Sequence, residues 1–156
     1  MKAVELNNTI EEMILKLKLS PNSPMTFPEQ EEVINEQSRK YWDKIKNSSG
    51  LEKTLAVDTY VLILELYWNL IKTNIDANKD SKNQAIEFVN RSSINDIKAI
   101  YLSADSETKT EIGKSLVRLY PIYLEATIYS FGGGSGYHMA AYTQSLKDLE
   151  EMTIVS

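Results

Sequence analysis

The chain has 156 residues, of which 42% are hydrophobic and 25% are charged, and it contains no cysteine. This composition is typical of a soluble globular domain, and the lack of cysteine excludes disulfides, a thiolate nucleophile and a metal centre with cysteine ligands. The formal net charge is −5. Nucleic-acid binding is disfavoured, because it depends on Lys and Arg side chains that neutralise phosphates.

The first pattern, over residues 3–17, is amphipathic. Its apolar side chains fall within about 100° of a helical wheel, which predicts a helix with one buried stripe. These residues are Ala3, Leu6, Ile10, Met13, Ile14 and Leu17. A loop rich in Ser and Pro follows at 20–24.

A second helix is predicted to begin after Thr26, because Thr26 and Glu29 have the spacing of a capping box. Ile34, Tyr41 and Ile45 share one face of this helix, which we expect to be buried.

Residues 51–73 form the most apolar segment. Its polar side chains fall within roughly 60° of the wheel, the reverse of a surface helix, so we predict a central helix that touches water along one narrow line. The polar residues are Thr54, Asp58, Glu65, Asn69 and Lys72. A membrane-spanning helix is disfavoured, because the charged side chains of Asp58 and Glu65 would be costly in a bilayer. They have the spacing of paired carboxylates, although a solvated edge explains the same pattern.

Two short helices are predicted around 85–89 and 94–101, with Ser93 as the N-cap of the second. A long apolar helix follows at 106–130 with a kink at Pro121, and a last helix at 137–152. The expected fold is an all-α, single-domain irregular or orthogonal bundle over 1–156, with about five to seven helices. The two apolar helices, 51–73 and 106–130, are its expected centre.

Residues 132–136 read Gly-Gly-Gly-Ser-Gly. Such a loop before a helix can bind an anion through its backbone N–H groups. A flexible connection between two helices is the simpler interpretation, and an engineered linker is a further alternative because the composition matches a designed spacer.

Tyrosines gather in the last third of the chain, beside the single histidine. Tyrosine side chains commonly line ligand pockets and protein interfaces. We therefore predict ligand or partner contacts at Tyr123, Tyr129, Tyr137, His138 and Tyr142. A neutral His138 could also serve as a general base, but no catalytic constellation accompanies it.

The sequence favours a non-enzymatic protein-binding domain, such as a small acidic inhibitor, an immunity-type protein or an adaptor. Its expected partner is another protein, with a basic surface as one option, and a homo-oligomer stays open. The alternative is a helical bundle that binds a small molecule in a Tyr-lined pocket. No cofactor, metal, nucleic acid or membrane is expected. Because Glu5, Glu11 and Glu12 interrupt the N-terminal apolar pattern, no secretory signal is expected either, and a cytoplasmic location is the default.

Overall fold

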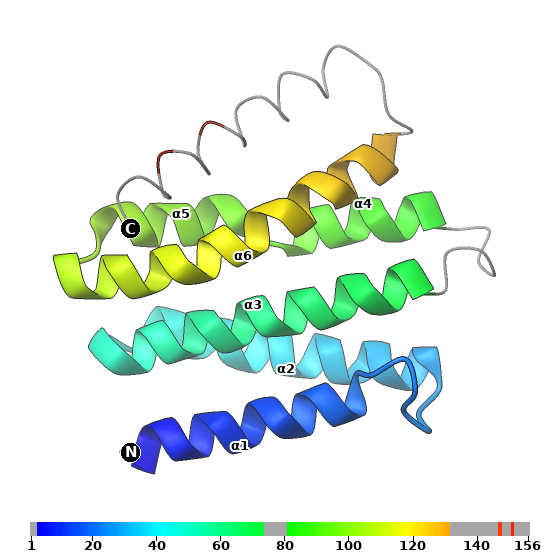
Figure 1. Ribbon diagram of the computed structural model, residues 1–156, viewed down its shortest axis with the longest axis horizontal. Helices are drawn as coiled ribbons and strands as arrows, with labels where there is room; N and C mark the ends of the chain where they lie inside the picture. The colour runs from blue at the N-terminus through cyan, green and yellow to red at the C-terminus, as the bar shows by residue number, and fades with distance from the viewer. Residues whose placement is uncertain (1–2, 74–80, 132–146, 148–150, 152–156) are drawn as a thin grey trace. The chain divides into compact units, whose positions relative to one another are not determined.

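The computed structural model describes residues 3–73, 81–131, 147 and 151. These residues form helices and no strand, which confirms the predicted all-α helical bundle (Figure 1). The helices are α1 (Ala3–Lys18), α2 (Phe27–Asn47), α3 (Gly50–Thr73), α4 (Ser81–Arg91), α5 (Ile94–Ser103) and α6 (Ser106–Phe131). The two long apolar helices of the prediction are α3 and α6. The loop at 132–136 and nearly all of the helix predicted at 137–152 lie outside the described residues.

The chain divides into two compact units, residues 1–73 and 74–156. In the first unit α1, α2 and α3 run in alternating directions, and α3 packs against both α2 and α1 (Figure 1). In the second unit α4 and α5 follow one another in the same direction, and α6 returns alongside both. The single domain over 1–156 stays a prediction.

The start of α2 confirms the predicted capping box. The Thr26 hydroxyl accepts a hydrogen bond from the Glu29 backbone N–H at 3.3 Å, and the Glu29 carboxylate accepts one from the Thr26 backbone N–H at 3.0 Å. These bonds satisfy two donors that a helix start leaves without an intrahelical partner. They also hold the pKa of the Glu29 carboxyl below its usual value, because they favour its charged form.

The inner face of α2 is also as predicted. Ile34, Tyr41 and Ile45 are all buried. Trp42 contacts Tyr60 of α3, with ring centroids 5.4 Å apart in a tilted arrangement typical of aromatic pairs. The face that the sequence pattern predicts is therefore the buried face of α2.

The buried side-chain amide of Gln30 connects the start of α2 to the end of α1 and the loop that follows it. The Gln30 side-chain NH₂ donates to the carbonyl oxygens of Lys18 at 3.0 Å and Ser20 at 2.9 Å. The last carbonyls of a helix have no intrahelical partner, so Gln30 supplies donors that the end of α1 lacks. Gln30 is only 4% exposed, which fixes this corner within the first unit.

Most of α3 is buried, as expected for a central helix. The prediction that one row of polar residues on α3 is exposed to water is only partly correct. Asn69 and Lys72 are exposed, but Asp58 and Glu65 are half-buried and Thr54 is buried. The Thr54 hydroxyl donates to the Leu51 carbonyl at 2.7 Å, which allows this polar side chain to leave water.

Among the described helices, α3 alone is long and apolar enough to cross a bilayer, and 67% of its most apolar window is buried within the structure. The core helix of a soluble protein has the same properties, so length and apolarity do not distinguish a membrane-spanning helix from a buried core helix.

The predicted orientation of α1 is wrong. The stripe predicted to be buried, formed by Ala3, Leu6, Ile10, Met13, Ile14 and Leu17, is exposed throughout. Leu15 is the buried residue of this helix. At about 100° per residue, Leu15, Asn8 and Glu12 lie opposite the stripe. The helix therefore packs on its more polar side.

The second unit contains a close approach of two helices. A Cβ on Gly113 of α6 would lie 3.1 Å from the Tyr101 ring of α5, so glycine permits this contact. Asp105 caps the start of α6 by accepting from the Thr108 backbone N–H at 2.8 Å, which lowers the pKa of Asp105. The helix continues through Pro121.

The prediction that the Ser93 side chain caps the start of α5 is wrong. Ser93 occupies the N-cap position of α5, but its side chain makes no capping hydrogen bond. Its φ of 52° places it in the left-handed region, where it links the end of α4 directly to α5. Its hydroxyl instead donates to the Arg91 carbonyl at 3.3 Å.

Candidate functional site

The predicted tyrosine-rich site is only partly within the described residues. Tyr123 and Tyr129 both belong to α6, and Tyr123 is half-buried. Its backbone carbonyl accepts a hydrogen bond from the Thr127 side-chain hydroxyl, one turn later in the helix, at 2.8 Å. Tyr137, His138 and Tyr142 lie outside the described residues. Contacts at this site stay a prediction.

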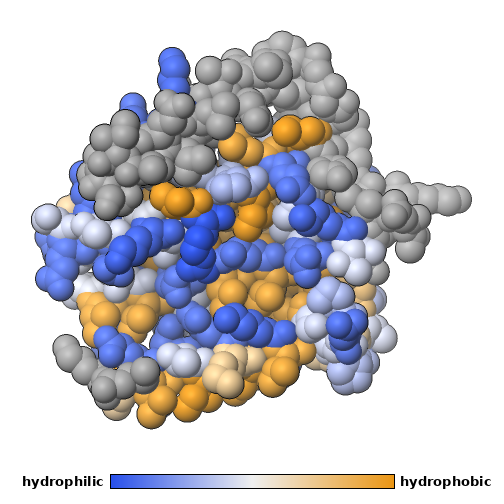
Figure 2. All heavy atoms as spheres, in the orientation of Figure 1, coloured by the Kyte–Doolittle hydropathy of each residue, from blue (hydrophilic) through white to orange (hydrophobic). Residues whose placement is uncertain are grey.

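The most unusual surface of the described residues is the apolar face of α1, which we call the α1 stripe (Ala3, Leu6, Ile10, Met13, Ile14 and Leu17). Its five large side chains are between 45% and 73% exposed. Figure 2 shows apolar residues gathered along the edge of the molecule where α1 lies. Contiguous exposed apolar residues of this kind mark interaction surfaces.

Polar contacts explain why α1 presents this stripe outward. On the opposite side, the Asn8 amide donates to the Glu12 carboxyl at 3.1 Å. The Thr59 hydroxyl of α3 lies 3.0 Å from the Asn8 oxygen and 3.2 Å from the same Glu12 oxygen. These groups are partly buried and satisfied by one another, which fixes the rotation of α1 against α3.

The same cluster contains two neighbouring carboxyl groups, Glu12 of α1 and Asp58 of α3. Burial, followed by the hydrogen bond and the negative charge of Asp58, raises the pKa of Glu12 from 4.5 to about 7. Thr59 and Lys16 act in the opposite direction. The spacing of Asp58 and Glu65 suggested either paired carboxylates or a solvated edge, and the effect of Asp58 on the pKa of Glu12 shows that Asp58 has a neighbouring carboxyl group on α1.

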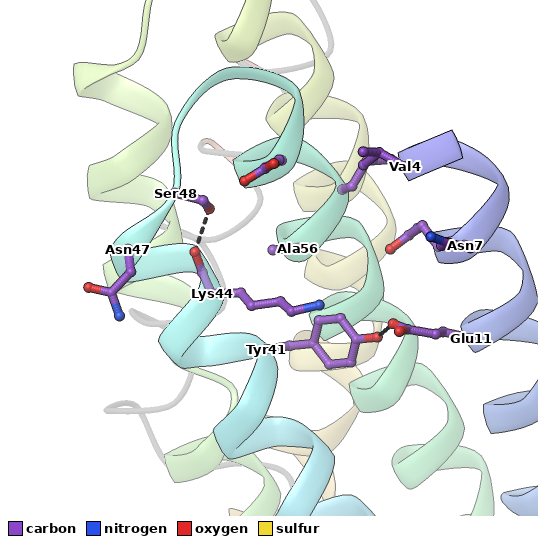
Figure 3. A pocket seen from close by; sticks show the side chains of 11 residues that line it. Val4, Asn7, Glu11, Tyr41, Lys44, Asn47, Ser48 and Ala56 are labelled. Carbon is purple, nitrogen blue, oxygen red and sulfur yellow. Dashed lines mark hydrogen bonds between the residues drawn. The ribbon is translucent and has the colours of Figure 1, made fainter. Parts of the chain in front are cut away.

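A groove of about 450 Å³ lies among α1, α2 and α3, entirely within the first unit. Tyr41 stands at one side, where its hydroxyl donates to the Glu11 carboxylate and the Lys44 ammonium lies 5.0 Å from its ring centroid (Figure 3). Lys40 lies 3.9 Å from Glu11. The remaining lining residues are Val4, Asn7, Asn8, Asn47, Ser48, Glu52, Leu55 and Ala56.

This groove was not predicted from the sequence, because its residues come from three helices. The prediction that Tyr41 lies on the buried face of α2 is correct for its ring, but it did not include the contact of its hydroxyl with Glu11. Within the described residues, no group of three or more His, Asp or Glu side chains is placed to hold a metal ion.

Comparisons with models of protein families, with curated proteins and with solved structures find no match to this chain. A functional conclusion therefore depends on the described residues.

Proposed function

We propose that the protein acts by binding another protein through the α1 stripe. The observation that carries this proposal is the exposure of the five large apolar side chains of α1, up to 73% at Leu17. Burying a Leu, Ile or Met side chain completely is worth about 1.5–3 kcal/mol, so burying the exposed halves of five of them offers several kcal/mol to a partner.

The stripe is not needed for the fold of the first unit. The polar contacts of α1 with α3 come from its opposite side, where Asn8 and Glu12 meet Thr59. Leu15, the buried residue of α1, also lies on that side. Folding leaves the stripe in water, where each apolar side chain is unfavourable. A binding role accounts for this arrangement.

The charges of α1 favour a protein partner over a lipid surface. Helices that lie on membranes are rich in Lys and Arg on their polar face. The described part of α1 carries Glu5, Glu11 and Glu12 against Lys16 and Lys18. Because the charge changes sign along the helix, a partner with the opposite order of charges fits better than a uniformly basic one.

The test uses the full chain as bait, with Leu17→Glu as the variant and Leu102→Glu as the matched control. Leu102, on α5, is 61% exposed but lies away from the stripe in the chain. Circular dichroism first confirms that all three proteins keep their helix content. We expect wild type and Leu102→Glu to retain a protein that Leu17→Glu does not retain. Once purified, that protein should bind wild type directly. Identical retention by all three baits would contradict the proposal.

A second candidate function, binding of a small molecule, is favoured by the groove beside Tyr41. Its volume of about 450 Å³ is within the range of ligand pockets. Glu11 and Glu52 contribute carboxylates, whereas Leu55 and Ala56 contribute apolar surface. This lining suits a small ligand with one positively charged group and an apolar part.

Phenethylamine is a suitable probe for this groove. We expect saturation-transfer NMR to detect its binding to wild type and to Asn95→Trp, a control on an exposed face of α5. Asn7→Trp, which places a large ring at the rim of the groove, should abolish the signal. No transfer to wild type, or transfer that Asn7→Trp leaves unchanged, would contradict this second function.

A further inference from the structure

We propose that Glu12 of α1 and Asp58 of α3 form a pH-sensitive switch for the groove beside Tyr41. When both carboxyl groups are charged, the N-terminal half of α1 separates from α3 and withdraws one wall of the groove. The opening itself requires no ligand, whereas its effect on binding rests on the small-molecule function proposed for this groove.

The groove and the two carboxyl groups are linked through Asn8. The residues that α1 contributes to the wall of the groove are Val4, Asn7, Asn8 and Glu11, opposite Ala56 of α3 (Figure 3). The Asn8 amide donates to the Glu12 carboxyl at 3.1 Å, and the Asn8 oxygen lies 3.0 Å from the Thr59 hydroxyl of α3. A change in the charge of Glu12 therefore reaches the groove through a direct contact.

Apolar packing holds the N-terminal half of α1 only weakly. Every residue from 3 to 12 is exposed or half-buried. The large apolar side chains in this range, Val4, Leu6 and Ile10, are between 43% and 49% exposed. The attachment of this half to α3 therefore depends on the polar contacts of Asn8 and Glu12 with Thr59.

The C-terminal end of α1 is held in place independently of these contacts. Leu15 and Leu19 are 4% and 0% exposed. The Gln30 amide of α2 also donates to the carbonyl oxygens of Lys18 and Ser20. The N-terminal half can therefore separate from α3 while residues 15–20 stay in place and act as a hinge.

The groups that face Glu12 make the contact sensitive to pH. From α3, Asp58 contributes a second carboxyl group, and the Thr59 hydroxyl lies 3.2 Å from a Glu12 oxygen. From α1 itself, Lys16 favours the charged form of Glu12. From α2, Lys40 pairs with Glu11, at 3.9 Å. Two neighbouring carboxylates that are partly removed from water disfavour the closed arrangement, which is the arrangement of the structure.

The direction of the pH dependence follows from proton binding. In the closed arrangement, burial of Glu12 and its interactions with Asp58 raise the pKa of Glu12 from 4.5 to about 7. After separation the side chain is in water, where its pKa returns toward 4.5. The closed arrangement therefore loses stability as the pH rises from about 4.5 to 7, and the effect is constant above that range.

A second contact of α1 limits how often the groove opens. Glu11 bonds to the Tyr41 hydroxyl and pairs with Lys40, both on α2. These contacts do not involve Glu12. They therefore oppose the opening at every pH and leave its dependence on Glu12 unchanged.

The reactivity of a single introduced cysteine tests the opening, because the chain has no cysteine of its own. Ala56 is 3% exposed and lines the groove, so the thiol of Ala56→Cys should react with a maleimide only when the wall opens. At pH 5 and pH 8 its rate is divided by that of Leu102→Cys, an exposed site, which removes the intrinsic pH dependence of a thiol.

We expect this ratio to rise at least about threefold from pH 5 to pH 8, a modest factor because the half-exposure of Glu12 screens the charges. In a Glu12→Gln background the ratio should be the same at both pH values. Circular dichroism confirms that each variant keeps its helix content. If Ala56→Cys does not fold, Leu55→Cys, which is half-buried in the same wall, takes its place.

Two results would overturn the inference. One is a ratio that stays constant with pH, or that changes equally in the Glu12→Gln background. The other is a ratio equal to the unfolded fraction that urea unfolding gives, because the cysteine would then be exposed only when the whole chain unfolds.

Saturation-transfer NMR with phenethylamine at the same two pH values distinguishes failure of the switch from failure of the small-molecule function. We expect weaker transfer to wild type at pH 8 than at pH 5, and equal transfer in Glu12→Gln. If the cysteine responds to pH but phenethylamine binds at neither value, the opening stands and the small-molecule function is wrong. If phenethylamine binds and the cysteine does not respond, the function stands and the switch is wrong.

Discussion

The carboxyl groups of Glu12 on α1 and Asp58 on α3 are neighbours in a partly buried cluster. Burial of Glu12 and its interactions with Asp58 disfavour its charged form, which raises the pKa of Glu12 from 4.5 to about 7. Between these two values the folded state binds more protons than the unfolded chain. The contribution of Glu12 to the free energy of unfolding therefore falls as the pH rises from about 4.5 to 7, and is constant above that range.

Glu12→Gln is expected to remove this dependence, because glutamine keeps the shape and the hydrogen bonds but carries no proton equilibrium. The half-exposure of Glu12 screens the effect, so we expect a difference of about 1 kcal/mol. Urea unfolding of wild type and Glu12→Gln at pH 5 and pH 8 measures it. The variant should gain stability relative to wild type by that amount between the two values.

Glu36→Gln is the matched control, since Glu36 is exposed on α2. It should not show the same relative gain. Parallel pH profiles for wild type and Glu12→Gln would mean that the raised pKa of Glu12 is incorrect.

Loss of the capping box is expected to destabilise the start of α2. Thr26→Ala removes the hydroxyl that accepts from the Glu29 backbone N–H. N-cap substitutions of this kind cost about 1 kcal/mol. Thermal unfolding should show a lower Tm for Thr26→Ala, whereas Thr26→Ser keeps the acceptor and should stay close to wild type. Equal losses in both variants would show that the methyl group, rather than the cap, matters.

Phe88 should be among the most costly side chains to truncate in the second unit. It is fully buried on α4, which packs against α6. Phe88→Ala is expected to lower the free energy of unfolding by about 3–5 kcal/mol, as for other large-to-small core substitutions. Leu102→Ala, at an exposed position, should change it by less than about 0.5 kcal/mol. Denaturant unfolding gives both values, and similar small losses would place Phe88 outside the core.

Gly113 is expected to resist substitution although it lies inside a helix. Alanine normally stabilises a helix by about 1 kcal/mol relative to glycine. At Gly113 its Cβ would press on the Tyr101 ring, which is only 5% exposed and has little room to move. We expect a net loss of stability for Gly113→Ala. A higher Tm than wild type would show that the ring relaxes freely.

Features that depend on one helix at a time were predicted from the sequence. The capping box at Thr26 is local, because its two hydrogen bonds join residues three apart. The narrow polar stripe of residues 51–73 identified α3 as a buried helix, because few polar positions had to be accommodated. The predicted bounds of 51–73 and 106–130 differ from α3 and α6 by one residue.

Features that depend on contacts between helices were not predicted. A hydrophobic pattern identifies which residues of α1 share a face, but it does not identify what covers that face. Two polar side chains, Asn8 and Glu12, found partners on α3, and this determined the rotation of the helix. The proximity of Asp58 to Glu12 was not predicted for the same reason, since the spacing of Asp58 and Glu65 along one helix is visible in a sequence and the approach of another helix is not.

The outward stripe of α1 has a consequence for how the protein behaves at high concentration. Replacing its leucines and isoleucines by polar residues would leave the inner contacts of α1 unchanged, so folding alone gives no reason to keep them. Such a stripe promotes self-adhesion and lowers solubility. In the proposed complex with a partner the helix is covered, so the cost to solubility falls on the free protein.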